Sequence, residues 1–547
     1  EDRLRNSEWD RILKNAVMNN SVLEYVVYKK ISDSKADEFE YIIICPDNAT
    51  FITYANQLKE FRTKQGIKTG VVTTTQIGGN TEAAIEAYVN NAYNNWDTPP
   101  SAVLMMADWG ASGSAGTLYA PIYDTAYPCV SDNFYADVIT TDGKALPEIT
   151  FARMTAQTEA HLQTMVSKII NNETNPPTSV NFYKNPITAL GWQTERWFQI
   201  CSETVGGYMR NELGKTPVRI NEIYEGNPTL DPWSTAINTS QVTGYFGPSG
   251  RGYIPGTPQE LGAWTGGDAT DVANAINGGA FMLMHRDHGF YQGWGEPDFV
   301  SDDINLLTNT TPTFIFSMNC QSGAFDYPSE VFAEKFHRYT YNGQNSGALG
   351  VLVASETSYS FVNDAYTWGT FDYMWPNYMN DYGAAPTNND EFMPAFASVS
   401  GKYFLDYSSW PYNTANKIDT NYLFHLHGDA YMVVYTEVPQ NLTVNHQDIF
   451  DSDNIAYVSA DPGAKIALVA NGQIIGKGTG TGSMTGITIV PQPYDTQVIL
   501  TVTKQNYVRY EQTIVVVVPN SGGDWAISSS NIPFGGVTVG GSATQQF

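Results

Sequence analysis

Cysteine and basic residues are both scarce in this chain of 547 residues. The four cysteines form no CxxC pair, which argues against a zinc ribbon or a thioredoxin-like redox motif. The 29 basic residues face 56 acidic ones, for a formal charge of -27. This balance argues against nucleic acid or an anionic membrane as the main partner. No apolar run reaches the length of a membrane span, so we expect no transmembrane segment.

The chain carries no visible signal peptide at Glu1. We therefore expect an exported protein to be present in mature or trimmed form. Its length and its apolar and aromatic content predict several globular domains with a large core.

Apolar runs alternate with helical segments from Glu38 onward. Phe39–Cys45, Ser101–Ala107, Gly279–Met284 and Pro312–Met318 read as strands that are buried on both faces. Such strands, alternating with helices, predict an α/β fold with mostly parallel sheets. In these sheets, functional sites form at the carboxyl ends of strands.

The pattern changes after Val438. Short Val/Ile/Thr-rich runs are separated by turn signals such as Pro462-Gly463 and Asn471-Gly472, which predicts a small immunoglobulin-like β-sandwich. Residues 532–547 resemble the first strands of another β-domain, so we expect the chain to be part of a longer precursor. The predicted divisions are an N-terminal extension (1–37), two α/β subdomains (38–180 and 181–437), the β-sandwich (438–519) and a linker with the start of a truncated β-domain (520–547).

Two segments of the second α/β subdomain carry the chemistry. Met284–Glu296 places His288-Gly289 after one apolar strand, and Thr313–Phe325 places Cys320 after the next. Parallel strands that end at one edge of a sheet would bring the imidazole and the thiol together. A cysteine nucleophile needs a group that holds it as thiolate and a backbone N–H that receives the developing oxyanion.

Cys320 differs from the other cysteines in its setting. It follows a strand and precedes Gln321-Ser322-Gly323, a flexible polar turn that can leave the thiol exposed. Cys45 lies in an apolar strand, Cys201 in a helical pattern and Cys129 in a loop rich in Tyr and Pro. We interpret these three as packing residues, although a buried structural role is also the common one for any single cysteine such as Cys320.

His285 and His288 form an HxxH pair, which raises the alternative of a metal site. No third ligand lies at a useful spacing, and the segment is a strand and loop rather than a helix. We predict His288 as the catalytic residue because Gly289 follows it, and a glycine lets the main chain turn its N–H toward a reacting carbonyl. His285 then has a structural role on the strand.

The segment HRDHG, followed by NCQSGAFDYPSEVFAE with Cys320 32 positions after His288, resembles the gingipain family of cysteine peptidases, in the caspase-like clan. His427-Gly428-Asp429-Ala430 resembles the Phe-Gly-Asp-Pro turn that closes the catalytic domain in this family, with His and Ala as departures. The resemblance implies a caspase-like catalytic domain of two α/β subdomains. Cys320 would be the nucleophile, His288 the general acid/base, and the N–H groups of Gly289 and Cys320 the oxyanion hole.

The resemblance implies further roles by position. Glu195, in GWQTER, matches the glutamate that orients the histidine in relatives, but it also fits a surface carboxylate. Asp364 and Phe361 match a pocket that holds Lys or Arg at P1, the residue whose carbonyl is attacked, and Asp364 equally fits a solvated loop acid. We assign Trp294 to substrate binding. Relatives carry structural calcium, for which Ser301-Asp302-Asp303 and Asn388–Glu391 are candidates, while catalysis needs no cofactor.

The sequence thus predicts a bacterial cysteine endopeptidase, secreted or at the cell surface, that cleaves protein or peptide substrates by acyl transfer, with P1 open between Lys/Arg and other residues. Two alternatives remain. One is a processing peptidase or transpeptidase that acts on sorting signals, and the other is a non-catalytic surface adhesin that keeps the fold.

Overall fold

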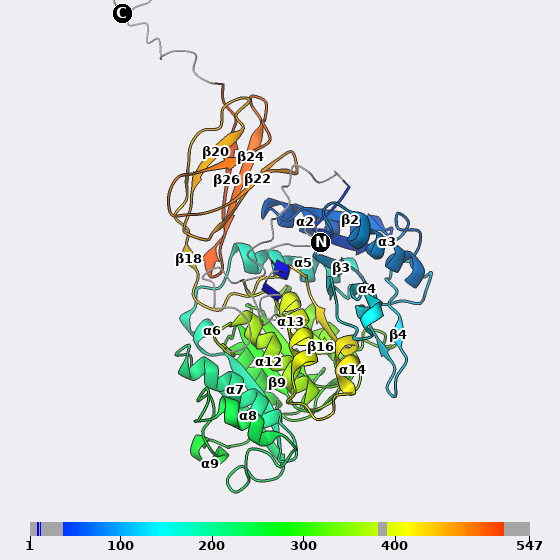
Figure 1. The fold of residues 1–547 in the computed structure, drawn as a ribbon, viewed down its shortest axis with the longest axis vertical. Helices are drawn as coiled ribbons and strands as arrows, with labels where there is room; N and C mark the ends of the chain where they lie inside the picture. The colour runs from blue at the N-terminus through cyan, green and yellow to red at the C-terminus, as the bar shows by residue number, and fades with distance from the viewer. Residues whose placement is uncertain (1–7, 10, 13–36, 381–390, 519–547) are drawn as a thin grey trace, which may run out of the picture.

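The computed structural model describes residues 8–9, 11–12, 37–380 and 391–518. Most of the predicted N-terminal extension, the candidate calcium residues 388–390 and the predicted truncated β-domain lie outside these residues. The described part consists of a large α/β body and a smaller β-domain at one end of the molecule (Figure 1). Among the described residues, no helix is long and apolar enough to cross a membrane.

A single ten-stranded sheet runs through the α/β body, in the order β2-β1-β3-β6-β17-β16-β13-β9-β7-β8. The strands are, in chain order, β1 (Tyr41–Cys45), β2 (Thr69–Thr73), β3 (Ala102–Met105), β6 (Thr150–Arg153), β7 (Ile187–Gln193), β8 (Val218–Glu225), β9 (Met282–Arg286), β13 (Thr313–Met318), β16 (Ala348–Ala354) and β17 (Phe424–His427). The sheet confirms the predicted α/β fold with mostly parallel strands. The two predicted subdomains share this sheet instead of having one each.

The one antiparallel pairing in the sheet joins β16 to β17, whereas β17 is parallel to β6. The strands from β2 to β17 therefore run opposite to those from β16 to β8. Since carboxyl ends of parallel strands share an edge, each half of the sheet presents its carboxyl ends at a different edge of the molecule.

Helices cover both faces of the sheet because its strands are apolar on both faces. On β13, Phe314 and Phe316 belong to one core cluster and Ile315 to another. The first cluster includes α12 (Val362–Met374) and α13 (Pro394–Tyr407), and the second includes α10 (Ala269–Asn277) and α11 (Phe332–Arg338). This alternation is what period-two strands produce in a three-layer fold.

The remaining helices of more than five residues are α2 (Ala49–Lys64), α3 (Glu82–Asn95), α5 (Glu159–Thr174), α7 (Phe198–Asn211), α8 (Thr239–Phe246) and α14 (Asn416–Leu423). Strand β8 and helices α12 and α13 are not evident in the sequence pattern. Every residue of α12 is buried, so it lacks the apolar and polar stripes by which a helix is recognised.

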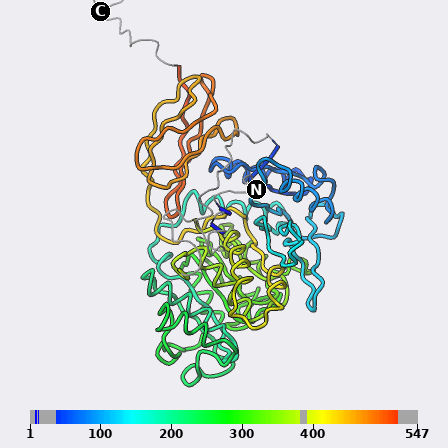
Figure 2. Tube along the Cα trace, viewed as in Figure 1, coloured from blue at the N-terminus to red at the C-terminus, as the bar shows by residue number. Residues whose placement is uncertain are grey.

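The C-terminal β-domain has its own small core, which includes Leu468 and Leu500. Its two larger sheets have the orders β19-β20-β23 and β22-β21-β24-β26. Their strands are β19 (Asn445–His446), β20 (Ile455–Ser459), β21 (Lys465–Ala470), β22 (Gln473–Thr479), β23 (Thr485–Thr488), β24 (Gln497–Thr503) and β26 (Tyr510–Val515). In Figure 2 this domain occupies one end of the trace, beyond the blue N-terminal helices.

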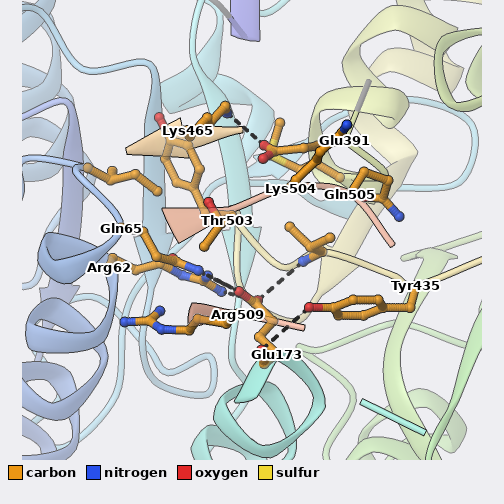
Figure 3. Close-up of a pocket in the computed structure, with 14 residues that line it drawn as sticks. Arg62, Gln65, Glu173, Glu391, Tyr435, Lys465, Thr503, Lys504, Gln505 and Arg509 are labelled. Carbon is orange, nitrogen blue, oxygen red and sulfur yellow. Dashed lines mark hydrogen bonds and ion pairs between the residues drawn. The ribbon is translucent and has the colours of Figure 1, made fainter. Parts of the chain in front are cut away.

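Charged side chains join the β-domain to the α/β body around a small cavity of about 50 Å³ (Figure 3). Lys465 of β21 contacts Glu391 of the α/β body at 2.7 Å. Arg62 of α2 forms an ion pair with Glu173 of α5 at 2.7 Å, and Arg509 lies 4.4 Å from the Phe61 ring centroid. The domain thus packs on helix α2 and on the segment that begins at Glu391 rather than on the strands that carry Cys320 and His288.

Candidate active site

Strands β9 and β13 place the predicted histidine and cysteine side by side. They pair in parallel, with Arg286 opposite Met318. His288 and Cys320 each lie two residues beyond this pair, at the carboxyl edge of the second half of the sheet. Both residues line the same pocket. The strand register therefore sets His288 and Cys320 at one edge of the sheet and in one pocket.

The pocket has a volume of about 360 Å³ and opens to solvent. Besides the two central residues, its lining comes from the start of α7, the end of β9, the segment before α12 and a later loop. These residues are Arg196, Phe198, Arg286, Asp287, Thr357, Ser358, Tyr359, Ser360, Phe361, Asn363, Tyr412 and Asn413.

The thiol of Cys320 contacts the loop that follows β16. The backbone N–H of Ser358 donates to Sγ at 3.3 Å, and Sγ lies 3.5 Å from the Ser358 carbonyl oxygen. Both main-chain polar groups of Ser358 therefore contact the sulfur. Ser358 is a contact of the nucleophile that sequence reasoning missed, because a serine in a loop gives no signal of its own.

Gly289 packs directly against the backbone of Cys320. A Cβ at this position would lie 2.5 Å from Asn319 Oδ1 and 2.7 Å from the Cys320 carbonyl oxygen. Close approach, rather than a left-handed backbone, is therefore the reason for glycine here. The result is that the main chain of Gly289 lies next to that of Cys320, where two N–H groups can serve one oxyanion.

Gln193, the last residue of β7, orients His288. The His288 Nε2–H donates to Gln193 Oε1 at 3.2 Å, while Gln193 Nε2 donates to Glu225 Oε2 at 2.7 Å. The second bond fixes which amide atom faces the ring, so Nδ1 remains available toward the thiol. Glu195, predicted for this role, is exposed in the turn after β7, and the described partner of the imidazole is Gln193 instead.

Burial lowers the pKa of His288 below its usual value, and the nearby guanidinium groups of Arg286 and Arg196 lower it further. The imidazole is therefore neutral near pH 7 and can accept a proton from the thiol. Gln193 was missed because the family pattern directs attention to an acid. Its place at the end of the strand next to β9 is the signal that could have found it.

His285 and Trp294 form the support behind the nucleophile. Their rings stack at a centroid distance of 4.4 Å, and Trp294 Nε1–H donates to Ser317 Oγ at 2.8 Å. His285 accepts from Asn319 Nδ2 at 2.8 Å and donates to the Glu296 carbonyl at 3.0 Å. Burial lowers the pKa of His285 to about 3, so it is a neutral structural residue, as predicted.

The position of Trp294 corrects its predicted role. The side chain is fully buried, packs against Phe299 and Phe332, and does not line the pocket. The indole holds the strand end that carries Cys320 and does not reach a substrate. A tryptophan near a motif is visible in sequence, but the face to which it points depends on the β-hairpin that carries it.

Phe361 lines the pocket, whereas Asp364 lies behind it. Phe361 has a φ of 73°, an uncommon value for an aromatic residue. Its N–H donates to Asp364 Oδ2 at 2.8 Å, and Arg286 Nε donates to Asp364 Oδ1 at 2.7 Å. The carboxylate predicted to hold a substrate cation is thus already paired with a cation of the chain, at the first turn of α12.

The other three cysteines are buried. Burial raises the pKa of Cys45 and Cys129 to about 12 and raises that of Cys201 well above its usual value. A thiol that stays protonated is a poor nucleophile. Within the described ranges, no group of three or more His, Cys, Asp or Glu residues could hold a metal ion.

The profile of peptidase family C25 matches residues 34–435, more than half of the chain and the whole ten-stranded sheet. The chain belongs to peptidase family C25. Membership confirms the predicted relationship to gingipains and, at the level of the family, the prediction of a cysteine peptidase.

Individual members of the C25 family match over most of this chain. Gingipain R1 of Porphyromonas gingivalis is 23% identical over 456 residues, which cover 80% of this chain and 39% of that protein. Gingipain R2 of the same species is 20% identical over 356 residues, which cover 63% of this chain and 40% of that protein. The chain thus spans about two fifths of the length of these relatives.

The solved structure of the Arg-specific cysteine proteinase gingipain R aligns with a TM-score of 0.69 at 18% identity, covering 89% of this chain and all of that one. The complex of the RgpB pro- and mature domains gives a TM-score of 0.68 at 18% identity, covering 87% of this chain. At this identity the likeness shows a common fold, the caspase-like α/β fold of gingipain.

Proposed function

We propose that this protein is a cysteine endopeptidase that cleaves protein chains through a thioester intermediate. The observation that carries the proposal is the register of β9 and β13, which sets His288 and Cys320 at equal offsets from one strand pair and in one pocket. The C25 membership of residues 34–435 supports the same activity.

In the proposed reaction, Cys320 Sγ attacks the scissile carbonyl carbon as His288 takes up the thiol proton. The N–H groups of Gly289 and Cys320 receive the oxyanion, and His288 then protonates the leaving amine. Water hydrolyses the thioester and returns the thiol. Gln193, held by Glu225, keeps the imidazole in one orientation throughout.

Several further expectations belong to this proposal. We propose that residues 438–519 form an immunoglobulin-like domain, that the protein acts outside a bacterial cell, and that the chain continues into further domains. The seven strands in two sheets support the first of these. Structural calcium stays a prediction.

A preference for Lys or Arg at P1 has support from the relatives, one of which is described as Arg-specific. In this chain the carboxylate that would provide it, Asp364, forms an ion pair with Arg286. Asp364 is therefore not free to act as the counter-charge, and the one carboxyl group among the described residues that line the pocket is that of Asp287.

The test compares Cys320→Ala with Cys201→Ala in the full chain. Cleavage of a denatured protein substrate, followed by mass spectrometry of the fragments, should fall at least about ten-thousandfold for Cys320→Ala. Cys201→Ala should keep turnover but lose about 1–2 kcal/mol of unfolding free energy, because it creates a cavity. Iodoacetamide should label Cys320 first. Activity retained in Cys320→Ala would refute the assignment, and an amine-ligated product would indicate a transpeptidase.

A further inference from the structure

The pocket beside Cys320 carries more positive than negative groups. Its lining holds two guanidinium groups, from Arg196 and Arg286, and one carboxyl group, from Asp287. Burial and the neighbouring Glu296 raise the pKa of Asp287 well above its usual value. Tyr224 donates a hydrogen bond to it at 3.0 Å.

Arg196 is the cation of this pocket that the chain leaves without a carboxylate. Among the described residues it forms no ion pair, and its buried Nε has no hydrogen-bond partner. It stands immediately before α7, in the turn that begins at Gln193 and directs this segment toward His288. A guanidinium group that lines a ligand pocket and has no carboxylate partner within the protein is suited to bind a ligand carboxylate in a bidentate geometry.

Arg286 contributes a second, partly satisfied guanidinium group. Nε donates to Asp364 and Nη1 donates to the Met318 carbonyl at 3.0 Å, but Nη2 has no hydrogen-bond partner in the described part of the chain. Its side chain is only 1% exposed and lies over the Phe198 ring, 4.2 Å from the centroid. The Arg286 side chain cannot rotate into solvent, so the positive electrostatic potential of its guanidinium group acts on the pocket.

Two helices also begin at this pocket. Phe198, the first residue of α7, and Asn363, in the first turn of α12, both line it. The first turn of α7 contains no acidic residue. Helix N-termini favour negative charge, so α7 adds to the effect of the two guanidinium groups, whereas Asp364 already occupies the first turn of α12.

We propose that the pocket selects an acidic residue, Asp or Glu, at P1, with Arg196 as its ion-pair partner. The inference rests on the proposed peptidase activity and specifies its substrate class. A Lys or Arg at P1 would instead place a third cation beside Arg196 and Arg286. Like charges that meet in a partly desolvated site oppose binding.

The experiment uses fluorogenic peptides that differ only at P1, with Asp, Asn, Glu, Gln, Lys or Arg. We expect kcat/KM for Asp to exceed that for the isosteric Asn by at least about thirtyfold, and Glu to exceed Gln similarly. Peptides with Lys or Arg should be the poorest. A wild-type preference for Lys, Arg or a neutral residue would overturn the inference.

Variants of Arg196 test the assigned partner. Arg196→Gln should bring the Asp/Asn ratio to within about threefold of one, and Arg196→Glu should favour Lys over Asp. Using the ratio removes any effect of Arg196 on His288, because both substrates need the same imidazole. Arg210→Gln, on the same helix α7, is the matched control and should keep the wild-type ratio. An unchanged ratio in Arg196→Gln would refute the assignment.

Failure of this inference is distinguishable from failure of the proposed function. If Cys320-dependent cleavage of denatured protein occurs after basic or neutral residues, the peptidase stands and the acidic preference falls. If the unmodified, folded chain cuts no peptide bond although iodoacetamide labels Cys320 in a parallel sample, both fall. Unfolding temperatures of the Arg196 variants exclude misfolding as the reason for a lost preference.

Discussion

Two buried arginines end strands in opposite halves of the sheet, and their guanidinium groups differ in hydrogen bonding. Arg153 ends β6 and Arg286 ends β9. Each is at most 1% exposed, and each lies over a phenylalanine ring: Phe325 at 4.7 Å for Arg153 and Phe198 at 4.2 Å for Arg286. Since the two halves of the sheet run in opposite directions, the arginines point to opposite edges.

The difference lies in how completely each guanidinium group is bonded. Arg153 holds both oxygens of Asp132, with Nε at 2.8 Å and Nη2 at 2.6 Å, and its Nη1 donates to the carbonyls of Ala107 and Leu118. Arg286 holds one oxygen of Asp364 and leaves Nη2 without a partner. Arg153, at one edge of the sheet, thus has hydrogen-bond partners for all of its guanidinium nitrogens. Arg286, at the edge that carries the candidate site, has one nitrogen without a partner.

The largest effect expected from this comparison is on stability. Arg153→Met leaves Asp132 buried without its cation and should cost about 3–5 kcal/mol of unfolding free energy. Arg286→Met should cost less, because Asp364 keeps the N–H of Phe361, but it should lower kcat/KM of the folded enzyme. Urea unfolding and peptide assays on both variants provide the measurement. Equal losses of unfolding free energy in the two variants, with unchanged kcat/KM in Arg286→Met, would contradict the proposed difference between the two arginines.

A smaller effect concerns the imidazole that lies near Arg153. His427 is fully buried, and neither of its ring nitrogens has a hydrogen-bond partner in the described structure. Burial, and then the charge of Arg153, lower its pKa to about 3. Below the unfolded value of about 6.5, the unfolded chain binds a proton that the folded chain does not, so stability is lost as pH falls toward 3.

His427→Phe should remove this loss. Relative to the variant, the wild type should lose about 2 kcal/mol between pH 6.5 and pH 5. Other titrating groups are present in both proteins and cancel in the difference. Denaturant unfolding at several pH values measures it, and parallel curves for the two proteins would show that His427 is solvated or partnered when folded.

Asp364→Asn sharpens the comparison at the site. Removing the carboxylate leaves Arg286 uncompensated, so the pocket becomes more positive and the preference for Asp over Asn at P1 should rise by about tenfold at most. If Asp364 instead held a substrate cation, the same variant would lose about a hundredfold in kcat/KM for Lys and Arg substrates. The two outcomes differ in sign and are read from the same peptide set. Asp132→Asn, at the other edge, is the control.

The smallest effect concerns the two phenylalanine rings under the arginines. Phe325→Leu should cost about 1 kcal/mol of stability through the lost cation–π contact. Phe198→Leu should cost about the same and also change KM, since Phe198 lines the pocket and its ring lies 5.3 Å from that of His288. Calorimetry with steady-state kinetics checks both, and a KM change in Phe325→Leu would contradict the separation of the two edges.

The sequence was enough to predict that His288 and Cys320 lie in one pocket, because the placement of these two residues depends on local signals. A buried strand followed by His-Gly, and another followed by Cys and a polar turn, fix both residues once the strands are taken as parallel neighbours. It could not find the Arg286–Asp364 pair or the bond from His288 to Gln193. Those contacts join residues 78 and 95 positions apart and depend on where α12 and β7 pack. Glu195 and Trp294 were assigned by position in a motif, and neither lines the pocket.

The close packing of Gly289 has a consequence for the comparison of C25 sequences. Under the proposed mechanism, a chain that retains both the histidine and the cysteine can still lose activity, because any side chain after the histidine would collide with Asn319 and the carbonyl of Cys320. The residue at this position is therefore an independent criterion for separating active members from inactive descendants. It can be scored from sequence alone, without knowledge of the substrate.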